Sequence, residues 1–420
     1  MSKNSTEFNQ KYRISADLIS KLKLSKDEKI SNNIGGKPKV LLLEIIKRFF
    51  TNPVVVIAFI VFIAIILTSV FVTTFSQYPA VKPIDANLPN DQKVANFQSL
   101  PPIFDPFKET TDIGVIRNLQ KWQNPNFEYY KYLSPYAANS HFIIPGKVVK
   151  YNAYLYFDGA QLQSKLIEYT KEHGRPSLAT ADIAGIIASI PKLKTFLGTN
   201  ALGADIWTSV WKGTLESLWV AFFVATVEII IGVFVGAYLG FNAGKWLDTF
   251  MMRLIEIFTS PPSIIWLLLF VTIWGTNPWV LIGGLLFVGW TGPIGVTRLF
   301  IITVKDEEYI MAAKSIGASE TRQIFLHALP AILGKIAMSY VRRIPSVILS
   351  IASLAFLGFF KDNDSANLGK FMLDNLEASK GNVWLLILPA LILLGISISL
   401  QFTAIGLHDA LDPKVIKVKR

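Results

Sequence analysis

The residues that could do chemistry in this chain are few. The sequence contains no cysteine and four histidines, which are well separated, so thiol catalysis and clustered metal sites are not expected. It also lacks a Gly-x-x-x-x-Gly-Lys-Ser/Thr run, the loop that cradles nucleotide phosphates. We therefore predict no catalytic residue and no cofactor or metal site. What remains are charged side chains in apolar stretches, chiefly Arg342 and Arg343, and such charges are rare and usually functional.

The elements that must position these arginines are membrane-spanning helices. The chain is 51% hydrophobic and 17% charged, with a mean hydropathy of +0.42. Long runs without any charge occupy residues 49–81, 257–297 and 381–408, and each exceeds the roughly 20 residues that a helix needs to cross about 30 Å of hydrocarbon. The predicted spans are 53–75, 215–242, 250–274, 279–303, 330–359 and 383–407.

The net charge of +11 raises the question of nucleic acid. The basic residues gather in the N-terminal tail, at the ends of spans and in the last residues of the chain, where they follow the positive-inside pattern of membrane proteins. No nucleic-acid-binding motif accompanies them. Membrane lipid, and not nucleic acid, is therefore the expected surroundings.

The spans divide the chain into regions. The first apolar run lies too far from Met1 for a cleavable signal sequence, so the N-terminal tail is expected to remain in the cytoplasm and the first span to be retained. Six crossings return the C-terminus to the cytoplasm. The predicted regions are a cytoplasmic tail at 1–43, a first transmembrane helix at 44–77, an extracellular insertion at 78–211, a five-helix core at 212–408 and a cytoplasmic tail at 409–420.

The insertion has the composition of a small folded domain. Alternating apolar residues at 147–157 predict a half-buried strand, and helical spacing at 161–173 predicts a helix. A small α+β domain outside the cell is therefore expected.

The cytoplasmic segment 305–329 is too regular in pattern for a linker. Acidic residues at 306–308 favour the start of a helix, and Gly317 can end it in a left-handed conformation. A second short helix is predicted from about Ser319 to Pro330. The small residues that would let another protein pack closely on this segment are Ala312, Ala313 and Gly317.

The run EYIMAAKSIGASETRQIFLHALP at 308–330 resembles the cytoplasmic loop of ABC-importer permeases, in which Glu-Ala-Ala, a following Gly and a terminal Leu-Pro dock on the ATPase subunit. Met311 stands where that Glu usually stands, so any salt bridge made by the Glu is absent or is supplied by Glu308. The resemblance implies the following coupling residues: Glu308, Met311, Ala312, Ala313, Gly317, Ala318, Leu329 and Pro330.

Further stretches resemble the C-type permease subunit of oligopeptide and dipeptide importers. They are residues 196–205, where Ala204 replaces an Arg of the family pattern, 252–261, 354–358 and 406–413. The resemblance covers about 45–77 and 196–413, and the insertion between these regions is unmatched.

This resemblance implies an all-α polytopic membrane protein with six transmembrane helices, the fold of type I ABC importer permeases, carrying a small α+β insertion. The expected location is the bacterial plasma membrane. The implied partners are two ATPase subunits that bind ATP and Mg, a second homologous permease subunit, an extracellular peptide-binding protein or lipoprotein, and the peptide itself. The chain would not be an enzyme, since nucleotide binding by the partners would push the loop and tilt the spans.

Two interpretations of Arg342 and Arg343 remain open. They lie roughly 18 to 20 Å along the fifth helix from Pro330, and at least one could face a central path and meet a peptide carboxylate or carbonyl groups. Alternatively they pair with Glu216, Glu228 or the other permease subunit, or extend to the membrane interface. Closely similar permeases carry nickel chelates or other solutes, so the solute is also open.

Other classes of protein fit less well. An ion-coupled secondary transporter would use Glu216 and Glu228, but it leaves the pattern at 305–329 unexplained. A membrane-embedded hydrolase lacks a nucleophile near a suitable histidine, and His327 is expected to serve loop packing. Arg253 and Glu256 are three residues apart at a helix start, where an ion pair is natural.

Overall fold

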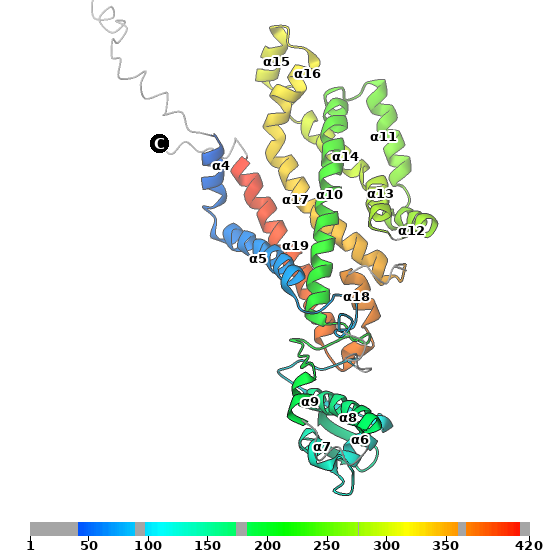
Figure 1. Ribbon diagram of the computed structural model, residues 1–420. Coiled ribbons are helices and arrows are strands. Elements are labelled where there is room, and N and C mark those ends of the chain that lie inside the picture. Colours follow the sequence, from blue (N-terminus) through cyan, green and yellow to red (C-terminus); the bar gives the residue numbers. More distant parts are fainter. Residues whose placement is uncertain (1–40, 89–96, 174–182, 276, 360–366, 412–420) are drawn as a thin grey trace, which may run out of the picture. The chain divides into compact units, whose positions relative to one another are not determined.

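The computed structural model describes residues 41–88, 97–173, 183–275, 277–359 and 367–411 (Figure 1). The chain divides into two units between Lys47 and Arg48. Helix α4 (Leu41–Phe49) crosses the division, and all elements from α5 (Pro53–Phe75) onward belong to the second unit. Most of the two predicted tails lies outside the described residues.

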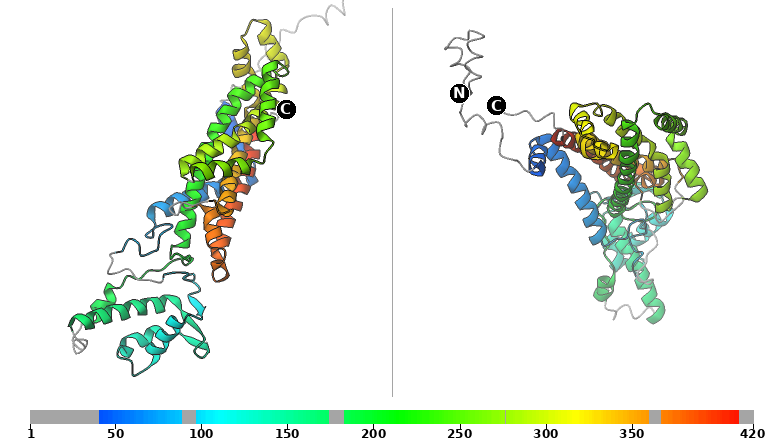
Figure 2. Two further views of the ribbon diagram at one scale, coloured as in Figure 1. Left: turned by 90° about the vertical axis from the view of Figure 1, so that its right-hand side faces the viewer. Right: turned by 90° about the horizontal axis from the view of Figure 1, so that it is seen from above.

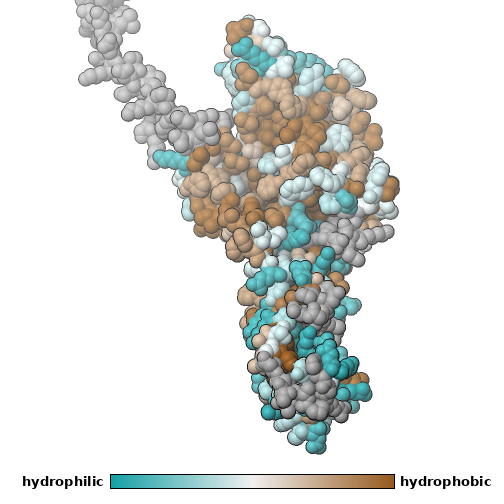
Figure 3. Space-filling model, viewed as in Figure 1, coloured by the Kyte–Doolittle hydropathy of each residue, from teal (hydrophilic) through white to brown (hydrophobic). Residues whose placement is uncertain are grey.

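Long apolar helices dominate the second unit. Within the described ranges, five helices are long and apolar enough to cross a membrane, and a bent pair makes six if it counts as one span. Figure 3 shows hydrophobic residues covering these helices, whereas hydrophilic residues cover much of the insertion. The predicted all-α polytopic fold is confirmed. The five are α5, α10 (Ile206–Phe241), α13 and α14 (Pro278–Gly289 and Thr291–Ile302), α16 to α17 (Glu320–Phe356) and α19 (Trp384–Leu411).

The third predicted span is broken. Helices α11 (Trp246–Thr259) and α12 (Ser263–Trp274) meet at an angle of 72°, so the span predicted at 250–274 corresponds to a bent pair of helices and not to one straight helix. Pro261 and Pro262 explain the break, because proline lacks an N–H for the helical hydrogen bond and disfavours helical geometry in the residue before it.

Helix α10 begins earlier than hydropathy predicts, at Ile206 inside the range assigned to the insertion. Asp205 caps it, because its side chain accepts hydrogen bonds from the Thr208 backbone N–H at 2.8 Å and from the Thr208 hydroxyl at 2.6 Å. The Thr208 hydroxyl lies 2.6 Å from that of Ser76, which directly follows α5. The two helices that flank the insertion are therefore joined where the insertion leaves and re-enters.

The segment between α5 and α10 (77–205, the insertion domain) has a hydrophobic core of its own. Leu119, Trp122, Leu133 and Leu162 are fully buried within it. Its described strands pair antiparallel in the order β1-β3-β2. The elements are β1 (Phe107–Thr110), α6 (Ile113–Gln123), α7 (Tyr130–Ala137), β2 (His141–Ile144), β3 (Val148–Asn152), α8 (Ala153–His173) and α9 (Ile183–Ser189).

The predicted strand at 147–157 is correct only in its first half. β3 ends at Asn152, whose side chain accepts hydrogen bonds from the backbone N–H groups of Tyr154 and Leu155, both at 3.1 Å. This asparagine cap starts α8 and turns the rest of the alternating stretch into helix. The predicted helix at 161–173 is confirmed as the later part of α8.

Helices α10 and α14 pack along a line of glycines. Gly232, Gly236 and Gly240 recur every fourth residue, and a Cβ on any of them would come within 2.3 to 2.6 Å of an atom of α14. Small residues at this spacing let two helix backbones approach closely. The α14 residues that they meet advance in the same direction: Pro293, Ile294 and Arg298.

The two polar regions of the second unit lie at opposite ends of α10. The insertion domain leads into its N-terminus, whereas Asn242, directly after its C-terminus, donates a hydrogen bond to Glu320 at the start of α16. The 36 residues of α10 extend about 54 Å, which exceeds the hydrocarbon thickness of a bilayer. Figures 1 and 2 show the same arrangement, with α15 (Glu308–Ser315) and α16 far from α6 to α9.

Near the last helix, α18 (Leu368–Asp374) and the short helix η4 (Ala378–Lys380) precede α19. Asn382 then donates a hydrogen bond to the carbonyl oxygen of Leu197 at 2.8 Å. The start of α19 is thereby tied to the segment that leads into α10.

Candidate functional site: a helical loop and a membrane cavity

The loop 305–329 ends its first helix in a rigid turn. Gly317 has φ of +86°, as its predicted left-handed conformation requires. Its N–H donates to the Lys314 carbonyl at 3.0 Å, and the Ala318 N–H donates to the Ala313 carbonyl at 3.0 Å. This pair of bonds is a Schellman motif, which fixes the direction in which the chain leaves α15.

The second half of the loop differs from the prediction. Ser319 caps α16 by accepting from the Arg322 N–H at 3.4 Å, but the helix does not stop at Pro330. It continues through the π-helical turn η3 (Gln323–Ala328) into α17 (Leu329–Phe356). Pro330 lies in the first turn of α17. Proline has a bulky ring and lacks an N–H, and the wider π turn before it accommodates both features.

The inner face of the loop packs on the ends of the membrane helices. Ile310 and Ile324 are buried in one cluster with Ala237 of α10, Ile301 of α14 and Ile332 of α17. The loop and the ends of α10, α14 and α17 therefore share one close-packed core.

The outer face of the loop exposes three large apolar side chains among charged and polar ones. Ile316 is 86% exposed, Met311 49% and Tyr309 44%. Glu308 and Ala312 are exposed as well. Apolar side chains gathered at the tip of a fixed turn are typical of a protein-binding surface.

A cavity of about 300 Å³ lies beside Met311. Glu308 is not among the residues that line it. The charged residues that line it are Lys245, Lys305, Asp306, Lys314 and Glu320.

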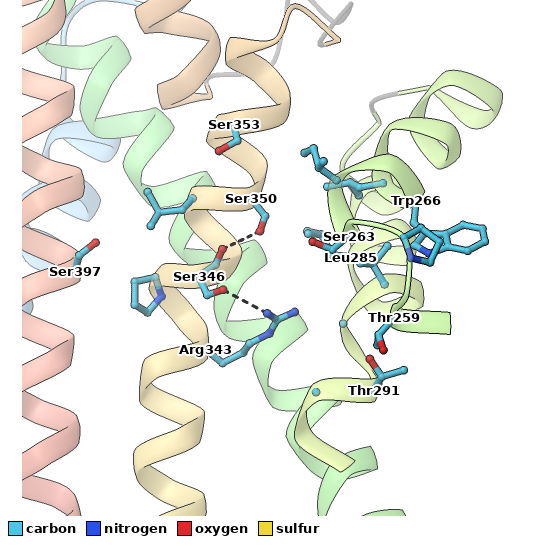
Figure 4. A pocket seen from close by; sticks show the side chains of 18 of the residues that line it. Thr259, Ser263, Trp266, Leu285, Thr291, Arg343, Ser346, Ser350, Ser353 and Ser397 are labelled. Atoms are coloured by element: carbon cyan, nitrogen blue, oxygen red, sulfur yellow. Dashed lines mark hydrogen bonds between the residues drawn. The ribbon is translucent and has the colours of Figure 1, made fainter. Parts of the chain in front are cut away.

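A larger cavity of about 1020 Å³ lies among α11 to α14, α17 and α19 (Figure 4). Hydroxyl groups recur along its α17 side at Ser346, Ser350 and Ser353, with Ser263 on α12. Figure 4 shows Arg343 and Ser346 on the side of α17 that faces the α12–α14 helices. The cavity is thus lined mainly by apolar side chains, with neutral hydroxyl groups and a single charge among them.

Arg343 lines this cavity and is held by a buried carboxylate. Its Nε and Nη2 donate to the two carboxylate oxygens of Glu228 on α10, the second at 2.9 Å, while its Nη1 lies 3.4 Å from the Ser346 hydroxyl. The Glu228 side chain is 0% exposed and that of Arg343 is 27% exposed. The interpretation of Arg343 as the partner of Glu228 is therefore confirmed, and the same arginine also faces the cavity.

Gly289 on α13 makes room for this ion pair. A Cβ at this position would lie 1.7 Å from Oε1 of Glu228 and 2.3 Å from Nη2 of Arg343. The sequence alone gave no sign of this contact, because the three residues come from three different helices.

Arg342 points elsewhere. It is exposed and lines a second cavity of about 310 Å³ between α14 and α17, to which Arg343 and Ser346 also contribute. Both predicted arginines therefore line cavities of the membrane region.

The other charged residues weighed from the sequence are accounted for by neighbours. Glu216 lies 3.9 Å from Lys212 on the same helix. Arg253 and Glu256 form the expected ion pair at 2.8 Å, on the surface of α11. Both carboxylates of α10 on which an ion-coupled transporter would depend thus face a cation.

An ion pair between α11 and α14 was not predicted from the sequence. Arg298 of α14 donates to both oxygens of the Asp248 carboxylate on α11, at 2.5 and 2.7 Å, and the Gly244 N–H donates to the same carboxylate at 2.9 Å. Neither Arg298 nor Asp248 lines the large cavity. This pair therefore joins helices without facing the space in Figure 4.

Comparison with known proteins relates most of the chain to peptide permeases. Residues 229–417 match the family described as binding-protein-dependent transport system inner membrane component, and residues 41–102 match the N-terminal TM domain of oligopeptide transport permease C. The oligopeptide transport system permease protein OppC of Mycoplasma pneumoniae is 33% identical over 93% of this chain and 94% of its own length. The chain belongs to the oligopeptide transport permease C family.

Relatives in this family align with different lengths of this chain. The OppC protein of Mycoplasma genitalium is 32% identical over 93% of this chain, so most of the insertion domain lies within that alignment. The dipeptide transport system permease protein DppC of Bacillus subtilis is 31% identical over only 54% of this chain and 70% of its own length. The insertion domain, unmatched in the sequence interpretation, therefore has counterparts in the Mycoplasma relatives.

Proposed function

We propose that the chain forms half of the membrane path of an ATP-driven peptide importer and is coupled to ATPase subunits through the loop 305–329. The observation that carries the proposal is the uncovered apolar tip of this loop, with Ile316 and Met311 exposed above a Schellman turn at Gly317. Such a surface needs a protein partner, and its buried inner face connects that partner to α10, α14 and α17.

The distribution of charge supports an orientation. Lys245, Lys305 and Lys314 lie at the loop end of α10, whereas the turn around Asn277 at the other end of α12 and α13 carries no charge. By the positive-inside rule the loop is cytoplasmic and the insertion domain is outside the cell. With this orientation both termini are cytoplasmic.

The expected assembly follows from this orientation and from the lack of a nucleotide-binding motif in the sequence. Two ATPase subunits bind ATP and Mg on the cytoplasmic side, a second permease subunit completes the path, and an extracellular binding protein or lipoprotein delivers the peptide. This chain hydrolyses nothing itself. Its coupling residues are the exposed Glu308, Met311, Ala312 and Gly317, together with Ala313, Ala318, Leu329 and Pro330 that hold them.

Movement of the loop opens and closes the path. When the ATPase pair closes, it presses on α15, and the packed cluster around Ile310 passes the displacement to α10, α14 and α17. Because α17 forms one wall of the large cavity and α12 to α14 form another, the same displacement changes access to it. Arg343 and the serines of α17 then contact the peptide.

The test is purification of the intact complex and its reconstitution into vesicles. We expect ATPase subunits and a second permease subunit to copurify, and ATP to drive uptake of a neutral tripeptide but not of a nickel chelate. Uptake that follows an ion gradient without ATP, or a complex that lacks any nucleotide-hydrolysing subunit, would refute the proposal.

A further inference from the structure

The large cavity holds one formal charge among many neutral polar groups. Of its lining residues, all of which lie in the described part of the chain, only Arg343 is charged. The Trp266 indole N–H donates to the Phe258 carbonyl oxygen, and the other lining side chains that can form hydrogen bonds carry hydroxyl groups or one amide: Thr259, Ser263, Thr291, Ser346, Ser350, Ser353, Ser397 and Gln401. These groups match the carbonyl and N–H groups that every peptide main chain carries, whatever its side chains.

The charge of Arg343 is compensated from outside the cavity. Glu228 is fully buried, does not line the cavity, and accepts from two nitrogens of the guanidinium. Arginine has five N–H donors, so donors on its remaining nitrogen positions stay available on the cavity side, near Ser346. The path can thus use the guanidinium as a hydrogen-bond donor without carrying a net charge.

We propose that Glu228 is a specificity-determining residue. By neutralising Arg343 it lets peptides with acidic, neutral and basic side chains be transported at similar rates. This inference rests on the proposed function, since it concerns how the same path treats different peptides. Without Glu228 the cavity would carry a net positive charge, which favours anionic peptides and repels cationic ones.

The structure supplies a matched control for loss of a buried carboxylate. Asp248 also forms a two-point ion pair with an arginine, Arg298, but neither residue lines the cavity. If the Glu228 pair only held helices together, Asp248→Asn and Glu228→Gln would impair transport in the same way. If Glu228 sets the charge of the path, only Glu228→Gln changes the relative uptake of peptides that differ in charge.

The experiment measures ATP-driven uptake of three tripeptides of equal length by the reconstituted complex: trialanine, one with a central lysine and one with a central glutamate. Wild-type uptake of trialanine tests the proposed function separately. For Glu228→Gln we expect the ratio of glutamate peptide to lysine peptide to rise roughly a hundredfold, because one uncompensated charge about 10 Å away at an effective dielectric constant of about 20 favours the first peptide and disfavours the second by roughly tenfold each. Asp248→Asn should leave the ratio unchanged, and the double variant Glu228→Gln/Arg343→Gln should restore it.

A second variant keeps the test decisive if Glu228→Gln does not assemble. Ser346→Lys adds a positive charge to the cavity lining and leaves the ion pair in place, so it should shift the ratio in the same direction. An unchanged ratio in whichever variant assembles, or an equal shift in Asp248→Asn, overturns the inference.

Discussion

The insertion domain and the loop 305–329 lie at opposite ends of α10 and differ in how completely they bury their apolar side chains. The insertion domain buries Leu119, Trp122 and Leu133 completely in a core of its own. The loop buries one face against the membrane helices and leaves Ile316 86% exposed at its tip. The first region buries its apolar residues by itself, whereas under the proposed function an ATPase subunit covers the exposed tip of the second. Function that depends on coupling is therefore expected to be far more sensitive to changes in the loop.

The largest effect is expected at Gly317. Gly317→Val places a β-branched residue at a φ of +86°, a strain of about 1 to 3 kcal/mol, and redirects the chain at the turn that presents Ile316. Peptide uptake should be lost while the protein still inserts into the membrane.

Gly244→Val is the matched control for Gly317→Val. Gly244 also has φ of +86° at the same end of α10, and at both glycines an added Cβ would meet nothing within 4 Å. The backbone strain is thus similar, but the loop tip is unchanged, so uptake should persist. Equal loss of uptake in both variants would mean that strain, and not coupling, is responsible.

The next effect concerns the exposed apolar tip. Ile316→Asp removes an apolar contact worth about 1.5 to 3 kcal/mol when buried in an interface, so ATPase subunits should bind roughly ten- to a hundredfold more weakly. The affinity is measured from the amount of ATPase subunit that copurifies at a series of ATPase concentrations. Ile113→Asp changes a residue of the same type, 62% exposed in the insertion domain, and should leave ATPase binding as it was.

A smaller and local effect is expected from the core of the insertion domain. Leu133→Ala should destabilise this domain by about 2 to 5 kcal/mol and make it sensitive to protease added outside the cell. ATPase copurification should not change, because the loop lies at the other end of α10. Loss of ATPase binding together with the protease sensitivity would contradict the separation of the two regions.

The smallest effect is a pH dependence confined to the insertion domain. Burial raises the pKa of the Asp158 carboxyl above its ordinary value, although Lys192 and Lys194 act to lower it. Because the folded domain then holds the proton more tightly than the unfolded chain, its stability falls as the pH rises from the ordinary pKa through the raised one. Asp158→Asn should remove this slope and stabilise the domain at neutral pH. Thermal unfolding of wild type and variant across this range, with identical slopes, would refute the assignment.

Much of the fold could be predicted from composition and periodicity alone. Hydropathy placed α5 at 53–75 and gave the later spans approximately, because apolar runs of this length have few alternatives. The left-handed turn at Gly317 was predictable because the flanking helical pattern requires an end there. Both features depend on residues close together in the sequence.

What could not be predicted depends on distant contacts or on single capping residues. The cap at Asp205 starts α10 in a stretch too polar to suggest a span, and the cap at Asn152 ends β3 within an alternating pattern. The pairing of Arg343 with Glu228 could be stated only as one of several alternatives, and the space at Gly289 not at all. The line of glycines on α10 was a readable signal that the prediction overlooked.

The central claim is that the loop tip meets an ATPase subunit inside the cell. Because the chain contains no cysteine, a single cysteine at Ile316 can be cross-linked with a thiol- and amine-reactive reagent in intact membranes, with a cysteine at Ile113 as the control. We predict that Ile316→Cys yields an adduct with a nucleotide-hydrolysing subunit and resists a membrane-impermeant thiol reagent added outside, whereas Ile113→Cys is labelled by that reagent and forms no such adduct. Labelling of Ile316→Cys from outside, or the absence of an ATPase adduct, would contradict the account.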